Sequence, residues 1–257
     1  MLALKEIKTL QKDPKARLTL GLFIVEGIKM FRETPPDLIE QICLSESFER
    51  EHGKEVIARL GRERALSVSE VIPDGRMEKL SDTRSPQGIL LAVRQTKWEM
   101  EAVLNKEAPL ILLLEDVQDP GNVGTILRTA EAAGASGVFM TEGCADVYNP
   151  KTIRSTMGAV YRVPHIRLRD PDELLMACLE RDIRTYAAYL ETDSTYLDGD
   201  YKKGTAFLIG NESRGLSDDL LNKADRFIRI PMEGQVESLN AAMAAGILMY
   251  EAARQRR

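Results

Sequence analysis

The chain has 257 residues, a formal net charge of −5, 44% apolar residues and 29% charged residues. It is long enough for one large domain or two ordinary ones, and its composition excludes an intrinsically disordered protein. The negative net charge argues against a general polyanion binder. No apolar run approaches the roughly 20 residues that span a bilayer, and the N-terminal segment lacks the apolar core of a secretory signal. We therefore expect a cytoplasmic protein without a membrane segment.

The cysteine and histidine positions indicate neither a disulfide framework nor a metal site. Cys43, Cys144 and Cys178 are scattered and odd in number, and no CxxC pattern is present. His52 and His165 are far apart and are not in ligand spacing. A reducing compartment and a protein without bound metal are expected.

The first hundred residues alternate short apolar segments with amphipathic ones. This pattern predicts a small α/β unit. We expect strands at 22–27, 38–45, 65–69 and 88–95, and helices at 28–33 and 46–61.

A polar segment at 96–109, ending in proline, predicts a domain boundary near residue 105. The two expected domains are therefore 1–105 and 106–257. Residues 1–105 contain 17 basic and 17 acidic residues, whereas residues 106–257 contain 18 and 23. The N-terminal domain is thus the better candidate for contact with a polyanion.

The second domain repeats the alternation of strands and helices on a larger scale. Strands separated by helices predict a mostly parallel sheet that is covered on both faces. We expect strands at 110–115, 137–140, 183–188, 205–210 and 226–230, and helices at 122–134, 172–182, 216–223 and 238–253.

A glycine-bearing loop follows the first of these strands, at residues 119–124 (DPGNVG). It lacks the G-x-G-x-x-G spacing of a dinucleotide site and the G-K-[ST] ending of a Walker loop. Taken alone, it is compatible with an ordinary strand-to-helix turn. Asn122 and Arg128, six residues apart, are both able to reach the carboxyl edge of the sheet, where α/β proteins bind ligands.

Two further strands also end in glycine-bearing loops. FLIGNESRGLS (207–217) places Glu212 in a turn, and the segment 227–240 runs through Pro231 and Gly234 into the last helix. Because the carboxyl ends of parallel strands share one edge, the three loops predict one composite site.

The three segments closely resemble the three sequence motifs of the SpoU/TrmH family of RNA ribose 2′-O-methyltransferases, within the SPOUT superfamily. The matching motifs are NVGTILRTAEAAG, LIGNESRGL and IPMEGQVESLNAAMAAGILMYE, in that order. RSTMGAVYRVP (154–164) resembles the family's segment between the first two motifs. FIVEG (23–27) and SPQGILLAV (85–93) more loosely resemble the family's small substrate-binding domain.

The resemblance implies an α/β fold with a deep trefoil knot in its C-terminal part, preceded by a small α/β substrate-binding domain. It also implies S-adenosylmethionine as the cofactor and a homodimer formed through the C-terminal domain. The small apolar face of helix 238–253 fits a tight helix–helix contact in such a dimer. Packing of this helix on its own sheet is the alternative.

The resemblance also assigns site residues. Gly210 leaves room for the cofactor, and Ile230, Met232 and Leu239 grip the adenine; plain core positions are the alternative for Ile230 and Leu239. The catalytic set comprises Arg128, Asn122, Glu212, Ser238 and Asn240.

Individual roles within the catalytic set differ. Arg128 is expected to be essential, either as a general base or as a positive clamp on the target phosphate; arginine is ordinarily protonated, so the first role requires a large perturbation. The resemblance implies that Asn122 orients the ribose or Arg128. It implies that Glu212 shapes its turn and forms a hydrogen bond with the substrate or the neighbouring arginine. Ser238 and Asn240 contact the substrate or act as helix caps.

One departure from the family concerns RNA binding. Relatives often have a richly basic N-terminal stretch, whereas KDPKARLTLG (12–21) has three basic residues and one acid. The alternative RNA contacts are Arg59, Arg62, Arg64, Arg84 and Arg94.

Three functions remain as hypotheses. The first is an S-adenosylmethionine-dependent 2′-O-methyltransferase acting on structured RNA, with rRNA favoured over tRNA. The second is a non-catalytic RNA-binding relative that keeps the knotted fold, although all five residues of the catalytic set are present. The third, a nicotinamide-dependent oxidoreductase, lacks the fingerprint that it needs.

Overall fold

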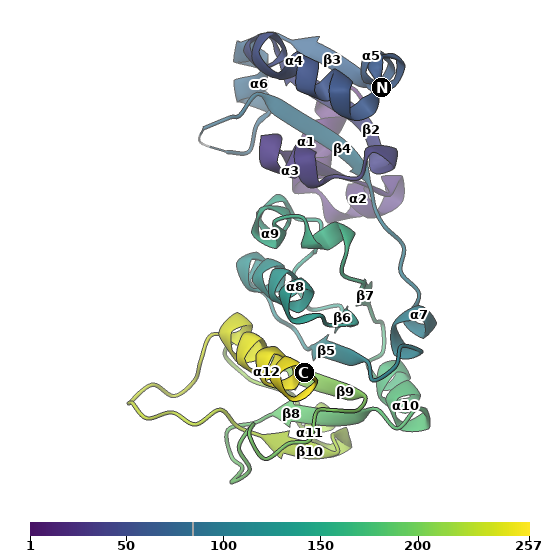
Figure 1. The fold of residues 1–257 in the computed structure, drawn as a ribbon. Helices are drawn as coiled ribbons and strands as arrows, with labels where there is room; N and C mark the ends of the chain where they lie inside the picture. Colours follow the sequence, from purple (N-terminus) through teal and green to yellow (C-terminus); the bar gives the residue numbers. More distant parts are fainter. Residues whose placement is uncertain (84) are drawn as a thin grey trace. The chain divides into compact units, whose positions relative to one another are not determined.

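The computed structural model describes residues 1–83 and 85–257, and the chain forms two compact units (Figure 1). Unit 1 comprises residues 1–97 and 146–161, and unit 2 comprises residues 98–145 and 162–257. The chain therefore leaves unit 2 after Ala145, packs into unit 1, and returns at Arg162. The functional division at residue 105 stays a prediction.

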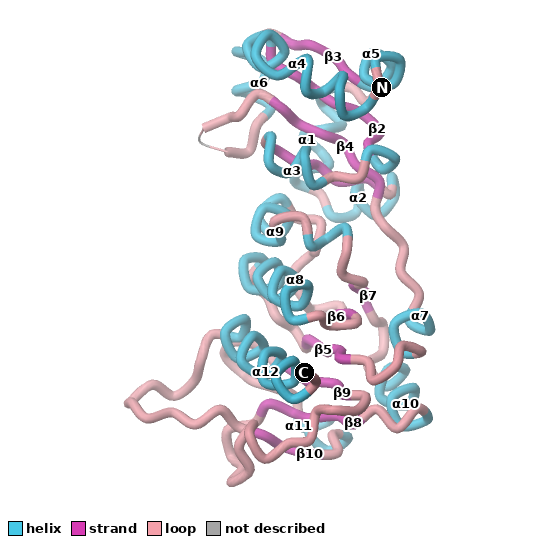
Figure 2. The backbone as a smooth tube through the Cα atoms, in the orientation of Figure 1, coloured by secondary structure: helices cyan, strands magenta, loops and turns pink. Residues whose placement is uncertain are grey.

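Unit 1 is built on a four-stranded mixed sheet in the order β1-β4-β2-β3, in which β4 is antiparallel to both β1 and β2. Figure 2 shows strands β2, β3 and β4 of this sheet in magenta. Its strands are β1 (Leu22–Glu26), β2 (Ile39–Ser45), β3 (Ser69–Ile72) and β4 (Ile89–Arg94). Its helices are α1 (Leu4–Lys12), α2 (Pro14–Leu20), α3 (Ile28–Glu33), η1 (Pro36–Leu38), α4 (Glu46–Leu60), α5 (Arg62–Val68), α6 (Asp74–Leu80), α9 (Pro150–Thr156) and η2 (Ala159–Tyr161).

The predicted strand at 65–69 is wrong, because these residues lie mostly in α5 and the strand β3 begins only at Ser69. The segment RERALSV is rich in helix-forming arginine, glutamate, alanine and leucine. The strands expected at 22–27, 38–45 and 88–95 are confirmed to within one residue at each end.

Unit 2 contains a six-stranded sheet in the order β10-β8-β9-β5-β6-β7, and every pairing in it is parallel. The strands are β5 (Leu110–Leu114), β6 (Gly137–Met140), β7 (His165–Arg167), β8 (Arg184–Ala188), β9 (Thr205–Ile209) and β10 (Arg226–Ile228). The helices are α7 (Met100–Leu104), α8 (Pro120–Ala133), α10 (Asp172–Glu180), α11 (Asp218–Lys223) and α12 (Ala241–Gln255).

Helices cover both faces of this sheet, as predicted. Buried side chains of α7, α10 and α11 form one core with residues of β5 and β9, while α8 and α12 pack on each other and α12 also contacts β9. Strand β5 is buried along its whole length, which explains its unbroken apolar sequence LILLL.

Three helices begin at other residues than predicted, namely α8, α11 (at Asp218) and α12. Helix α8 begins at Pro120, so most of the expected glycine loop is its first turn: Asp119 Oδ1 accepts hydrogen bonds from the backbone N–H of Gly121 (2.6 Å) and Asn122 (3.0 Å). Proline suits this first position because its fixed φ is helical and its missing N–H is not needed. Helix α12 begins at Ala241, after Asn240.

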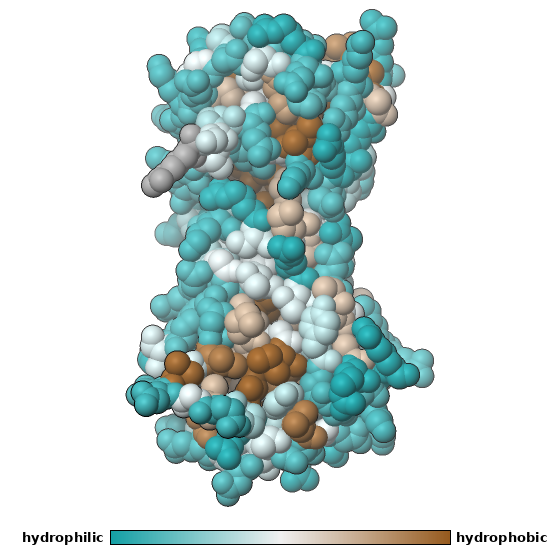
Figure 3. Space-filling model, turned by 60° about the vertical axis from the view of Figure 1, so that its left-hand side comes forward, coloured by the Kyte–Doolittle hydropathy of each residue, from teal (hydrophilic) through white to brown (hydrophobic). Residues whose placement is uncertain are grey.

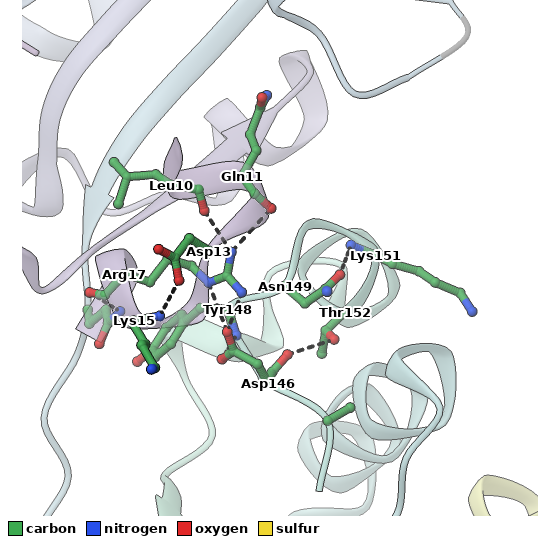
Figure 4. Close-up of polar contacts among 12 residues, drawn as sticks. Leu10, Gln11, Asp13, Lys15, Arg17, Asp146, Tyr148, Asn149, Lys151 and Thr152 are labelled. Carbon is green, nitrogen blue, oxygen red and sulfur yellow. Dashed lines mark hydrogen bonds and ion pairs between the residues drawn. The ribbon is translucent and has the colours of Figure 1, made fainter. Parts of the chain in front are cut away.

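The segment 146–161 is fastened into unit 1 by a buried ion pair (Figure 4). Arg17, whose side chain is 2% exposed, donates from Nε to Asp146 Oδ2 (2.8 Å) and from Nη1 to the carbonyl oxygens of Leu10 (2.7 Å) and Gln11 (3.2 Å). The ring of Phe23 packs against Tyr148, with centroids 4.7 Å apart. We call the ion pair and its two carbonyl contacts the Arg17 clasp.

The three cysteines are buried and free. His165 is buried against Trp98, and burial lowers its pKa to about 4. Within residues 1–83 and 85–257, no helix combines the length and the apolar character needed to cross a membrane.

Candidate functional site

The three motif segments meet at the carboxyl edge of the unit 2 sheet. Strands β5 and β9 are adjacent and parallel, so the start of α8 and the turn after Ile209 lie side by side. The N-terminus of α12 joins them, because α12 packs against α8. This is the edge at which parallel α/β sheets bind ligands.

A chain of hydrogen bonds connects one residue from each motif. Asn240 Nδ2 donates to Asn122 Oδ1 at 2.9 Å, and Asn122 Nδ2 donates to Glu212 Oε1 at 2.9 Å. Both ends of the Asn122 amide are thereby engaged, which fixes its orientation. We call this chain the amide relay; it brings together three of the five predicted catalytic residues.

Both termini of the amide relay are anchored to the backbone. Asn240 Oδ1 caps α12 by accepting from the N–H groups of Ala242 (2.9 Å) and Met243 (3.2 Å). Glu212 accepts from the N–H groups of Gln118 and Asp119, both at 3.2 Å. The capping role is therefore confirmed for Asn240, while Ser238 is an exposed residue outside the helix.

Glu212 is held as a carboxylate. Desolvation, its largest single influence, raises the pKa of Glu212, but the hydrogen bonds from Asn122 and from backbone N–H groups together lower it below the ordinary glutamate value. Because the pKa of Glu212 is lower in the folded state, its ionisation stabilises the fold at pH values above the ordinary glutamate pKa. This stabilisation is lost as the pH falls through the folded-state pKa.

Replacing Glu212 with glutamine should remove this pH-dependent contribution. Both carboxylate oxygens of Glu212 accept hydrogen bonds, whereas glutamine has a single acceptor oxygen. The variant should therefore have a lower melting temperature than the wild type at pH 7. The difference in melting temperature should become smaller toward pH 3. Thermal scans across this range measure it, with the exposed Glu63→Gln variant as control. A gap that is constant with pH would contradict the carboxylate role.

A pocket of about 340 Å³ opens beside the amide relay. All four predicted cofactor residues line it, namely Gly210, Ile230, Met232 and Leu239, together with Glu212 and Ser238. Ile230 and Leu239 are half-buried and line the pocket, and their contact with the cofactor stays a prediction.

Gly210 is required by the closeness of two backbone segments. A Cβ atom at this position would lie 2.1 Å from the carbonyl carbon of Gly215 and 2.2 Å from the nitrogen of Leu216. Neither backbone atom can move aside without displacing the turn at 211–215. The glycine therefore makes the pocket's wall possible.

In the Gly210→Ala variant, the added Cβ should displace the 211–215 turn that forms the pocket wall. Overpacking of this kind costs about 2 kcal/mol, so S-adenosylmethionine should bind about thirtyfold more weakly. Titration calorimetry measures this loss, and circular dichroism verifies that the variant is folded. Gly234→Ala is the matched control, since a Cβ there meets no atom within 4 Å of the described structure. Unchanged affinity in Gly210→Ala would contradict the role of this wall.

The pocket also includes residues that sequence reasoning missed. Tyr189, Leu190 and Glu191 follow β8, and Arg229 follows β10. The sequence does contain a signal for these residues. Strands are predicted at 183–188 and 226–230, and in a parallel sheet the residues that follow them lie at the same edge as those that follow β5 and β9.

Arg128 lies on α8, two turns beyond the relay residue Asn122, and its side chain is exposed. It does not line the pocket. Within the described part of the chain it has neither an ion pair nor a side-chain hydrogen bond, so its guanidinium is available to a substrate. The structure thus leaves Arg128 outside the amide relay.

The proposed basic residues of the N-terminal domain are mostly occupied by structural contacts. Arg59 donates to Thr34 O (2.9 Å), Arg64 donates to Ile39 O (3.0 Å), and Arg94 pairs with Glu40 (3.5 Å). Arg62 is exposed, and Arg84 lies outside the described residues. These arginines hold the segment 34–40 in place, which weakens the expectation that they contact RNA.

Comparisons with known proteins agree with this site. Residues 109–250 match the SpoU rRNA Methylase family, and residues 3–91 match the MRM3-like substrate binding domain. The chain is 31% identical to the 23S rRNA (guanosine(2553)-2′-O)-methyltransferase RlmP of Bacillus subtilis, over 92% of this chain and 90% of the relative.

Solved structures share the fold. The SpoU methyltransferase AviRb from Streptomyces viridochromogenes, in complex with the cofactor AdoMet, has a TM-score of 0.86 at 28% identity, covering 98% of this chain and 97% of that one. The AdoMet-bound rRNA methyltransferase from Sinorhizobium meliloti has a TM-score of 0.83 at 28% identity, covering 98% and 94%. As the three motifs predicted, the chain belongs to the SpoU rRNA methylase family.

Proposed function

We propose that this protein transfers the methyl group of S-adenosylmethionine to a ribose 2′-hydroxyl of structured RNA, with rRNA favoured over tRNA. The enzyme class follows from the family: the chain is an S-adenosylmethionine-dependent RNA methyltransferase. The observation that supports the finer proposal is the amide relay, which joins the three motifs beside one pocket. The rRNA preference is supported by rRNA substrates in the names of relatives such as RlmP.

The residues of the pocket fit the cofactor. Its volume of about 340 Å³ falls within the range of small-molecule sites, and the bare backbone at Gly210 lets a ligand approach closely. Ile230, Met232 and Leu239 supply apolar surface and main-chain groups for a flat, uncharged base. When bound, S-adenosylmethionine supplies an electrophilic methyl group whose sulfur departs neutral.

Arg128 acts on the RNA in this proposal. An exposed guanidinium without an internal partner in the described chain can form paired hydrogen bonds to a phosphate beside the target ribose. The same charge stabilises the oxyanion that develops when the hydroxyl loses its proton to solvent water. We favour this clamp over general-base catalysis, because a guanidinium ordinarily keeps its charge and Arg128 is exposed.

The amide relay positions the substrate side of the pocket. Asn122 and Glu212 are locked by their mutual contacts, so they hold the α8 N-terminus and the 211–215 turn at a fixed separation. Ser238 lines the pocket and is exposed, which leaves its hydroxyl free to contact ribose or cofactor.

A homodimer through α12 is part of the proposal. Helix α12 does pack within its own unit, against α8 and β9. It also leaves Met243 (59% exposed) and Tyr250 (51% exposed) on one side, with half-buried Ile247 between them at helical spacing. Figure 3 shows apolar residues, in brown, gathered on the surface of unit 2 in the lower part of the view. A second copy would cover such a face symmetrically.

The trefoil knot is also proposed. It is supported by the out-of-sequence strand order, with β9 inserted between β8 and β5, and by the return of α12 to α8 after β10. A cytoplasmic location is also proposed, supported by the similarity to the bacterial enzyme RlmP. Among the described residues, no cluster of histidine, cysteine or carboxylate groups could hold a metal ion.

The decisive experiment is transfer of labelled methyl from S-adenosylmethionine into unmodified rRNA and tRNA pools, followed by digestion to nucleosides. A 2′-O-methyl nucleoside from the rRNA pool supports the full proposal, and one from tRNA alone would contradict the substrate preference. Cofactor binding without transfer to either pool would favour the non-catalytic relative. S-adenosylmethionine, and not NAD, should raise the melting temperature.

A further inference from the structure

Helix α1 presents a continuous lysine face. Lys5, Lys8 and Lys12 recur at intervals of three and four residues, so they lie on one side of the helix, and all are exposed. The opposite side is buried through Ile7 and Leu10. Lys15, exposed in the first turn of α2, continues the same charge beyond the bend. We call these four residues the α1 lysine face.

The α1 lysine face is not neutralised by its own segment. Residues 1–20 contain five basic and two acidic residues, whereas residues 21–97 contain twelve and thirteen. The two local acids accept backbone hydrogen bonds: Glu6 from Ala3 N (2.6 Å) and Asp13 from Lys15 N (2.8 Å). Within residues 1–83 and 85–257, none of the four lysines forms an ion pair, which leaves their charge to an external partner.

The Arg17 clasp holds this surface in one conformation. Its guanidinium binds the carbonyl oxygens of Leu10 and Gln11, in the last turn of α1, and anchors them to Asp146 (Figure 4). Gln11 also donates to Leu80 O at 3.0 Å. These contacts hold the backbone of the α1–α2 bend between Lys12 and Lys15, so binding does not have to order the backbone there.

We propose that the α1 lysine face binds RNA phosphates and is the principal electrostatic contact of the substrate-binding domain. This inference rests on the proposed function, because it assumes that the substrate is RNA. Lys5 and Lys12 are about 10 Å apart along the helix axis, so their side chains can follow a run of backbone phosphates. In this proposal, these lysines contact the RNA in place of Arg59, Arg64 and Arg94.

The test compares two triple variants with the same loss of charge. Lys5→Gln/Lys8→Gln/Lys12→Gln removes three charges from the α1 lysine face. Lys29→Gln/Lys54→Gln/Lys79→Gln removes three exposed charges from α3, α4 and α6 of the same unit. Binding of a labelled, unmodified large-subunit rRNA transcript is measured from 50 to 300 mM salt by anisotropy, without cofactor.

The α1 triple variant should bind at least about tenfold more weakly at low salt, and its slope of log affinity against log salt should fall by about 2–3. The control triple should retain the wild-type slope. Equal losses in both variants would reduce the effect to net charge, and an unchanged α1 triple would overturn the inference. Because binding is read without methyl transfer, RNA binding by an inactive wild type would refute the proposed function alone.

Discussion

Replacing Arg128 with alanine should reduce methyl transfer about 10³-fold, the size expected when a single charged donor to a developing oxyanion is removed. Affinity for S-adenosylmethionine should stay within about twofold of the wild type, because Arg128 does not line the pocket. The side chain is exposed and has no internal partner in the described chain, so the fold should not depend on it. Single-turnover transfer and cofactor titration measure the two effects separately.

Two companion variants sharpen this result. Arg169→Ala removes an exposed arginine from the same unit and should leave transfer unchanged. Arg128→Lys keeps the positive charge but loses the paired donors, so a phosphate clamp predicts an intermediate rate. Full activity in Arg128→Ala would refute the assigned role of this residue.

Arg17→Met should lower the free energy of unfolding by about 3 kcal/mol, because breaking a buried ion pair leaves an uncompensated charge. Methionine keeps the apolar volume of the side chain but leaves Asp146 and the carbonyl oxygens of Leu10 and Gln11 without their donor. Urea unfolding of the full chain, followed by fluorescence, measures the change.

Arg32→Met is the matched control for this variant. Arg32 pairs with Glu55 in the same unit at 2.6 Å, but its side chain is 54% exposed. Exposed pairs contribute about 0–1 kcal/mol, so this variant should be nearly neutral. Equal destabilisation by the two substitutions would show that burial of the Arg17 clasp does not set its strength.

Local chemistry made five of the six strands of unit 2 predictable, whereas the three-residue strand β7 was missed. The run LILLL, fully apolar because β5 is buried on both faces, identified the central strand. Gly210, Glu212 and Asn240 were assigned as site residues because their segments resemble the second and third motifs of the family. The same local reasoning failed at 65–69, where helix-forming residues were mistaken for a strand.

By itself, the sequence determined the family, the parallel sheet and four of the residues that line the pocket, since these depend on motifs and periodicities within short stretches. Only the tertiary structure decided which side chains pair across the chain. Asn122 meets residues 90 and 118 positions away, and Arg17 meets Asp146, 129 positions away. Such contacts leave no local pattern in the sequence, because they depend on how distant elements are arranged in space. For the same reason, the structure alone separated the arginines bound to carbonyl oxygens from the lysines that remain available for RNA.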